Sequence, residues 1–196
     1  MHCWLLYGRG KLVSEDVIKL EHVWKIFGEN AQAAMEAIEA RNLSKDQVLK
    51  EFKCVVGIAD CSFSVRKGEV FCVMGLSGSG KSTMVRHLNR LIEPTAGFIE
   101  VLGKDMRALA DVDLRAMRAR EIGMVFQHMA LLPHRTVRDN VAFPLQIRGA
   151  SKARRWDISQ QCLNLVNLNG YEDRFPAELS GGMQQRVGLA RALASD

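Results

Sequence analysis

The 196-residue chain is 47% hydrophobic and carries a formal net charge of +5. This length and apolar content fit one large or two small globular domains, and no apolar run approaches the roughly 20 residues needed to cross a bilayer. Basic residues are scattered, apart from Lys152, Arg154 and Arg155, which indicates a solvated helix face rather than a nucleic-acid surface. Five cysteines without a CxxC pair indicate reduced thiols, and the absence of a secretory leader predicts cytosolic residence.

The predicted elements alternate between strands and helices. Runs of β-branched and aromatic residues predict strands at residues 17–27, 55–65, 70–74, 98–102 and 122–126. Capping residues and apolar spacing predict helices at residues 31–41, after Ser44, at 82–92, at 111–120, after Thr136, around 158–166 and around 183–194. Ile158, Cys162, Leu165 and Val166 should form one apolar helix face, and Pro144 should kink or divide its helix. This alternation predicts an α/β core with a mainly helical middle third.

The strongest motif is GxxxxGK[ST] at residues 75–82, between a predicted strand and a predicted helix. Its glycines let the backbone wrap around phosphates, so that successive N–H groups and the helix N-terminus point at negative charge. Lys81 is expected to reach the β- and γ-phosphates of ATP, and the Ser82 hydroxyl to coordinate Mg²⁺. The alternative, a glycine-rich turn with a chance lysine, fits the strand-to-helix setting poorly. The predicted binding set is Gly75, Ser77, Gly78, Ser79, Gly80, Lys81, Ser82 and Thr83.

A second motif, Ser180-Gly181-Gly182, opens the last predicted helix. The first turn of that helix has no acidic residue, which leaves a positive helix end available to an external anion. Taken alone, the motif is explained as well or better by an ordinary serine N-cap with glycines easing the turn.

The phosphate loop, Val125-Phe126-Gln127 and the LSGGMQQR segment at 179–186 occur in the order and approximate spacing of ABC-type ATPases. The chain therefore resembles the nucleotide-binding subunit of an ABC transporter over residues 20–196. The resemblance implies a P-loop NTPase of ABC ATPase type, with an incomplete parallel core sheet, an antiparallel β subdomain and a helical subdomain. It implies an N-terminal extension at 1–16, an ATP-binding core at 17–126 with a helical insert at about 29–53, a helical subdomain at 127–178 and a signature segment at 179–196.

The resemblance also implies roles for individual residues. Gln127 is similar to the Q-loop glutamine, which senses Mg²⁺ and the γ-phosphate. Phe27 lies where the family places an aromatic residue against adenine, with a simple core role as the alternative. His128 and His134 are isolated, do not match the family's switch histidine, and are expected to be loop or interface residues. The signature residues implied to contact ATP held by a second copy are Ser180, Gly181, Gly182 and Gln184.

The helical insert, the phosphate loop and the NRLIEP segment at 89–94 look like the importer branch for glycine betaine, proline and choline. This branch implies a homodimer at the cytoplasmic face of the membrane, transmembrane permease subunits that contact residues 128–140, and an indirect link to a substrate-binding protein. No nucleic acid is expected as a partner. Specificity for an amine rests on this likeness alone.

The family places its Walker B aspartate, catalytic glutamate and switch histidine after the position of Ala194. We therefore expect a truncated sequence whose parent hydrolyses ATP and which itself hydrolyses little. One alternative is a soluble ABC ATPase acting on nucleic acid or ribosomes, although neither paired cassettes nor a long coiled-coil insertion is visible. Another alternative is a nonhydrolytic nucleotide-binding fragment.

Overall fold

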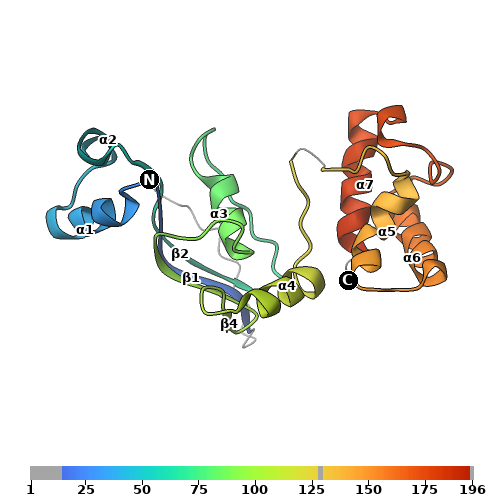
Figure 1. Cartoon of the computed structure of the whole chain (residues 1–196), viewed down its shortest axis with the longest axis horizontal. Helices are drawn as coiled ribbons and strands as arrows, with labels where there is room; N and C mark the ends of the chain where they lie inside the picture. Colours follow the sequence, from blue (N-terminus) through green and yellow to red (C-terminus); the bar gives the residue numbers. More distant parts are fainter. Residues whose placement is uncertain (1–14, 128–129, 195–196) are drawn as a thin grey trace. The chain divides into compact units, whose positions relative to one another are not determined.

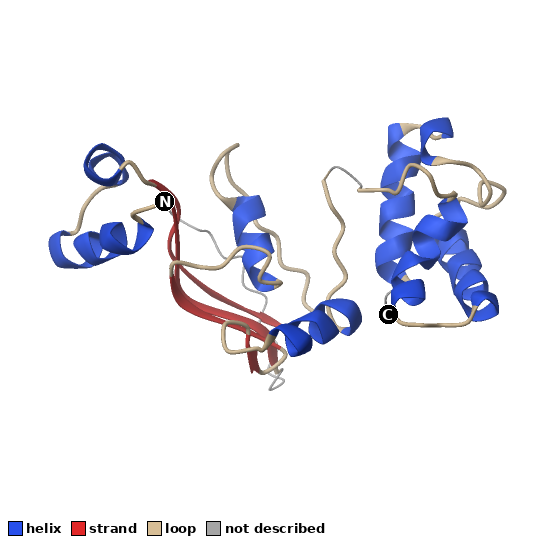
Figure 2. Ribbon diagram, viewed as in Figure 1, coloured by secondary structure: helices blue, strands red, loops and turns tan. Residues whose placement is uncertain are grey.

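The computed structural model describes residues 15–127 and 130–194, which divide between two compact units, Met1–Leu109 and Ala110–Asp196. The first unit is built on an antiparallel sheet with strand order β2-β1-β3-β4 (Figures 1 and 2). The strands are β1 (Asp16–Phe27), β2 (Val55–Arg66), β3 (Ala96–Val101) and β4 (Lys104–Asp105). The predicted strands at 17–27, 55–65 and 98–102 are thereby confirmed. Residues 1–14 of the predicted N-terminal extension lie outside the described residues.

The central strand β1 buries Leu20, Val23 and Ile26, which are three residues apart rather than two. Register shifts in its pairing with β2 occur between Leu20 and Val23 and between Val23 and Lys25. Such irregularities move the side-chain alternation by one residue and bend the strand. The bulged strand therefore keeps one apolar face toward the core despite its irregular spacing.

The predicted helical insert forms two helices, α1 (Ala31–Arg41) and α2 (Lys45–Phe52), between β1 and β2 (Figure 1). The Ser44 capping box is confirmed, because Ser44 N donates to Gln47 Oε1 at 2.8 Å and Gln47 N donates to Ser44 Oγ at 3.4 Å. Phe27 and Val55, on either side of the insert, are paired in the β1–β2 ladder. The insert thus takes the place of a hairpin turn, and β1 and β2 pair up to its two ends.

The helix after the phosphate loop, α3 (Lys81–Leu88), ends earlier than its apolar pattern predicts. The chain turns into the left-handed region at Arg90, where φ is 52°. Arg90 N donates to His87 O at 2.9 Å and Leu91 N donates to Arg86 O at 2.9 Å. This pair of bonds is the Schellman pattern that closes a helix C-terminus, so residues 89–92 lie outside the helix.

Two predicted strands, residues 70–74 and 122–126, are wrong, because both segments are irregular in the structure. Val70 is 89% exposed and Met74 is 85% exposed. A strand persists only where a neighbouring strand completes its backbone hydrogen bonds. The four-stranded sheet pairs neither segment, and residues 110–127 and 130–194 of the second unit form no strand. Apolar composition alone is therefore insufficient for strand formation here.

The second unit is helical in the part that the structure describes. Its helices are α4 (Asp111–Arg120), α5 (Val137–Ile147), α6 (Lys152–Leu165), the 3₁₀ helix η1 (Pro176–Glu178) and α7 (Gly181–Leu193). Helices α5, α6 and α7 lie side by side (Figure 1) and share one apolar core that includes Val141, Leu163 and Val187. Helix α5 continues through Pro144 and is not divided. The prediction that Leu165 faces the core is wrong, because Leu165 is 72% exposed and Leu163 is buried instead.

Among residues 15–127 and 130–194, no helix combines the length and the apolar character needed to cross a bilayer.

Acidification is expected to destabilise the first unit through His87. This side chain is fully buried, its Nδ1 lies 2.5 Å from Ile92 O, and its Nε2 has no hydrogen-bond partner. Burial lowers the His87 pKa below its usual value of 6.5, and the Ile92 carbonyl only partly offsets this. Below pH about 6.5 the unfolded chain therefore binds a proton that the folded chain excludes, and the unfolding free energy falls by up to about 1.4 kcal/mol per pH unit.

Urea unfolding of the wild type between pH 7 and pH 5 measures this dependence, and His87→Gln should flatten it. The exposed His134 provides the control, because His134→Gln should keep the wild-type slope. An equal slope in wild type and His87→Gln would contradict the assignment.

Candidate nucleotide site

The phosphate loop leads into a helix end that lacks a side-chain cap. Gly80 is the N-cap of α3, with φ at 90°, and the first turn of α3 contains no acidic residue. The helix begins with Met84 N donating to Gly80 O at 2.9 Å. The N–H groups of the first turn and the helix dipole thus present positive potential beside the loop.

Lys81 folds back across this loop. Its Nζ donates to Gly75 O at 2.8 Å and to Leu76 O at 2.7 Å, and it lies 3.4 Å from Ser79 Oγ. These neutral carbonyls are weaker acceptors for an ammonium than phosphate oxygens are. The amine is therefore held in the loop by contacts that a phosphate can replace. Ser77, Gly78 and Ser82 are exposed and Thr83 is half-buried.

Strand β2 supports the loop through Gly57, a residue that sequence reasoning missed. A Cβ atom on Gly80 would lie 2.5 Å from Gly57 O, and one on Gly57 would lie 2.7 Å from the ring of Phe27. Glycine inside a strand often marks a close backbone approach, which is the pattern that could have identified it. The structure thus brings Phe27 and the phosphate loop close to the same residue of β2.

Phe27 is 40% exposed, which contradicts the alternative that it is a simple core residue. Lys25 Nζ lies 5.2 Å from the centroid of its ring. A partly exposed aromatic face next to the phosphate loop can stack on a planar base.

The second unit carries the signature residues at the start of α7. Ser180 Oγ accepts from Met183 N at 3.4 Å, and no acidic residue lies in the first turn of α7. Cβ atoms added to Gly181 or Gly182 would meet nothing within 4 Å. The serine N-cap is therefore confirmed, and contact between this helix end and an external anion stays a prediction. Gln184 Nε2 donates to Pro176 O at 2.9 Å and to Leu179 O at 3.3 Å, which stabilises the turn before the motif.

Gln127 is exposed in a turn. His128, which was predicted to be a loop or interface residue, lies outside the described residues. The loop that follows is held by Asn140, whose importance sequence reasoning missed. Asn140 is fully buried, its Oδ1 accepts from Leu132 N at 2.7 Å, and its Nδ2 lies 3.0 Å to 3.1 Å from the carbonyls of Leu132, Arg135 and Thr136. An asparagine one turn after a threonine N-cap is the pattern that could have indicated this role.

A cavity of about 330 Å³ adjoins the Gln127 segment within the second unit. Its lining includes Phe126, Phe143, Pro144, Ile147, Arg118 and Arg191. This combination of apolar side chains and two arginines is typical of a surface that contacts another polypeptide.

A glycine-rich loop, its lysine and the open helix end that follows define a phosphate-loop protein. Residues 58–196 match the family model described as ABC transporter. The chain belongs to the ABC transporter family, as its motifs predict.

Curated relatives include ATP-binding proteins of osmolyte transport systems. The chain is 49% identical to the glycine betaine/proline betaine transport system ATP-binding protein ProV of Escherichia coli over 177 residues, which cover 90% of this chain and 44% of ProV. It is 47% identical to the trimethylamine N-oxide transport system ATP-binding protein TmoW of Pelagibacter ubique, over 93% of this chain and 53% of TmoW. The predicted likeness to the quaternary-amine importer branch is thereby confirmed. The chain spans about half the length of these relatives.

Solved structures confirm the fold class. The dimeric structure of MJ0796, a bacterial ABC transporter cassette, matches with a TM-score of 0.75 and 31% identity over 91% of this chain and 69% of that chain. A second MJ0796 structure, in a post-hydrolysis state bound to ADP and Pi, matches with a TM-score of 0.74 and 32% identity. The α/β ABC ATPase fold is thus shown, and a solved relative of that fold holds a nucleotide.

Proposed function

We propose that this chain is the ATP-binding, energy-coupling part of an importer for glycine betaine, proline or choline-like osmolytes. The observation that carries the proposal is the Lys81 loop at the uncapped N-terminus of α3. The names of ProV and TmoW, which describe ATP-binding proteins of amine transport systems, support the substrate class. In this proposal the protein works at the cytoplasmic face of the membrane, bound to a permease.

ATP binding in this proposal begins with an exchange of partners at Lys81. The ammonium leaves the carbonyls of Gly75 and Leu76 for the β- and γ-phosphate oxygens, where charge strengthens its hydrogen bonds. The N–H groups of the loop and of the first turn of α3 complete the phosphate contacts. Phe27 stacks on the adenine ring.

The bound nucleotide would bring Mg²⁺ with it. The Ser82 hydroxyl, exposed at the first turn of α3, and the exposed Gln127 amide are oxygen donors of the kind that Mg²⁺ prefers. Mg²⁺ would neutralise charge on the phosphates during phosphoryl transfer. Ser82 and Gln127 are therefore each proposed as a ligand of Mg²⁺.

The proposed assembly is a homodimer that also contacts permease subunits. The open helix end at Ser180, Gly181 and Gly182 would close over ATP held by the second copy, which fits the dimeric MJ0796 cassette. Gln184 would support this contact through the turn that it stabilises. The permease would dock beside the loop held by Asn140, and a substrate-binding protein would act through the permease.

Lys81→Ala tests the nucleotide site. We expect affinity for a fluorescent ATP analogue to fall by about 10- to 100-fold, because one charge-assisted set of phosphate contacts is lost. Lys67, an exposed lysine in the turn after β2, is the matched control, and Lys67→Ala should leave the affinity unchanged. Equal affinity in wild type and Lys81→Ala, or no binding by the wild type, would contradict the proposed site.

The substrate class needs a separate experiment. The chain is also 48% identical to the methionine import ATP-binding protein MetN of Halalkalibacterium halodurans, but that match covers 79% of this chain, against 90% for ProV. Uptake of labelled glycine betaine and of labelled methionine should be compared in cells carrying the transporter and in cells lacking it. Transporter-dependent uptake of glycine betaine is expected, and transporter-dependent uptake of methionine alone would overturn the amine assignment.

A further inference from the structure

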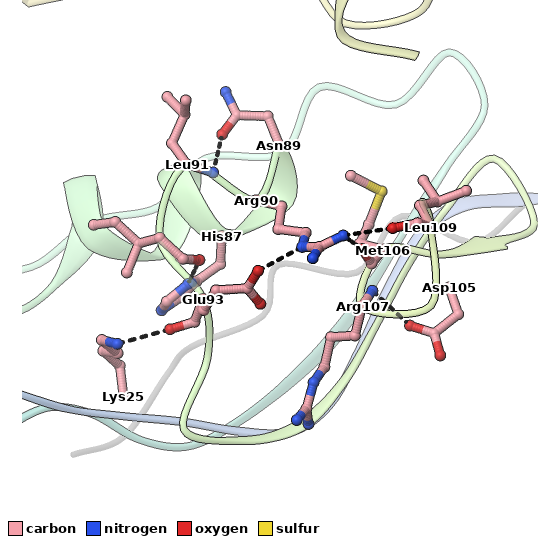
Figure 3. A network of polar contacts seen from close by, with 11 residues as sticks. Lys25, His87, Asn89, Arg90, Leu91, Glu93, Asp105, Met106, Arg107 and Leu109 are labelled. Atoms are coloured by element: carbon pink, nitrogen blue, oxygen red, sulfur yellow. Dashed lines mark hydrogen bonds and ion pairs between the residues drawn. The ribbon is translucent and has the colours of Figure 1, made fainter. Parts of the chain in front are cut away.

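We propose that Arg90 is a positioning residue that ties the nucleotide-binding end of the first unit to the point where the chain leaves that unit. Figure 3 shows its side chain between the loop after α3 and the segment that ends at Leu109. This inference rests on the proposed function, since it concerns how a bound nucleotide affects the rest of the chain.

The backbone conformation of Arg90 is unusual for an arginine. Arg90 occupies the left-handed position that closes α3, with φ at 52°, and glycine is the residue usually found there. An L-residue in this conformation is less stable than one in the right-handed region, because its Cβ atom approaches the following carbonyl oxygen. Helix termination therefore does not require an arginine, and a strained backbone position with a large side chain points to a role for that side chain.

The second observation is the set of acceptors that the guanidinium reaches. Arg90 Nε donates to Glu93 Oε1 at 2.6 Å, and Nη1 donates to Leu109 O at 2.7 Å and to Met106 O at 3.2 Å (Figure 3). The Arg90 side chain is only 18% exposed. Leu109 is the last residue of the first unit, and Ala110 is the N-cap of α4. One planar, forked donor thus contacts both the loop after α3 and the junction, through different nitrogens of the guanidinium.

The third observation is that the same loop is connected to the nucleotide site. Lys25 Nζ donates to Glu93 O at 2.7 Å and lies 5.2 Å from the ring centroid of Phe27. Helix α3, which begins at Lys81, runs directly into this loop. A displacement of Phe27 or of α3 on ATP binding therefore acts on the segment that Arg90 joins to Leu109.

Amide hydrogen exchange of the whole chain, with and without ATP, tests the proposal. In the wild type, ATP should slow exchange in residues 110–117 by about threefold or more. Arg90→Gly should lose this slowing while its ATP affinity stays within about twofold of wild type. Glycine is chosen because it favours the left-handed backbone, so the helix end should form normally. Without nucleotide, Arg90→Gly should also exchange about threefold faster than wild type in residues 106–112.

Arg107→Ala is the matched control. Arg107 lies between Met106 and Leu109 in the chain, but its Nη1 donates to Gly97 O and not to Leu109, so this variant should keep the ATP-induced slowing. Slowing that persists in Arg90→Gly, or a wild type that binds ATP without slowing at 110–117, would overturn the inference. A wild type that binds no ATP contradicts the proposed function instead. Even then, the hydrogen bonds from Arg90 can be tested without nucleotide. If residues 106–112 exchange at the same rate in Arg90→Gly and in the wild type, Arg90 does not hold the segment that ends at Leu109.

Discussion

Replacing Gly80 with alanine is expected to weaken ATP binding by on the order of 100-fold. Gly80 has φ at +90°, and a Cβ atom there would lie 2.5 Å from Gly57 O. Backbone strain and the displacement of a backbone carbonyl together cost about 3 kcal/mol. Without nucleotide, the loop of the variant can move away from β2 and avoid the clash. ATP binding requires Gly80 to lie close to Gly57 again, so the clash reduces the binding free energy.

Gly68→Ala is the control that distinguishes the effect of the Gly80–Gly57 contact from the effect of backbone strain alone. Gly68 also has a left-handed φ, at +77°, but a Cβ atom there would meet nothing within 4 Å, and the residue lies outside the loop. Gly68→Ala should lower stability by about 1 kcal/mol and leave ATP affinity unchanged. Titration with a fluorescent ATP analogue measures the affinity, and circular dichroism verifies that both variants fold. Wild-type affinity in Gly80→Ala would show that the contact with Gly57 is not needed for binding.

Replacing Asn140 with alanine is expected to lower the unfolding free energy of the second unit by about 3 to 4 kcal/mol. The substitution leaves a cavity in a fully buried position and removes the amide that pairs with the backbone of residues 132–136. Leu132 N–H and the carbonyl of Arg135 would lose their hydrogen bonds to the Asn140 amide, and an unsatisfied buried polar group costs about 1 to 3 kcal/mol.

Native-state hydrogen exchange of the most protected amides in α5, α6 and α7 measures this change for the second unit alone. Asn164 is the control, because it is exposed and its side-chain oxygen accepts a hydrogen bond from Gln160 at the surface of α6. Asn164→Ala should change the unfolding free energy by less than about 0.5 kcal/mol. A similarly small effect of Asn140→Ala would mean that the loop is held by other contacts.

Most local features of this fold follow from the sequence. The Ser44 capping box forms as predicted, because it joins groups three residues apart in the chain. At Thr136 a capping box was also predicted, but only the N-cap bond forms, with Thr136 Oγ1 accepting from Asp139 N at 3.2 Å. Helices α1 and α4 occupy the predicted residues, because helical hydrogen bonds also join near neighbours in the chain. The end of α3 was predicted too late, because its apolar pattern continues past the point where the backbone turns at Arg90.

The predicted strands at 70–74 and 122–126 did not form, although their composition favours strands. A strand depends on a partner whose position the local residues do not specify. The importance of Gly57 and Asn140 was missed for a related reason, since each acts through contacts that only the folded chain brings together.

The sequence by itself determined the phosphate-binding chemistry and the family of this protein. Glycine spacing, the lysine and the following helix are interactions between close neighbours in the chain, so they can be recognised without a fold. Only the tertiary structure decided where Lys81 rests, which backbone supports Gly80, and how Arg90 reaches Leu109. Three contacts join segments that are well separated in sequence: Gly57 with Gly80, Lys25 with Glu93, and Arg90 with Leu109. The residue that each one contacts is determined by how the folded chain packs.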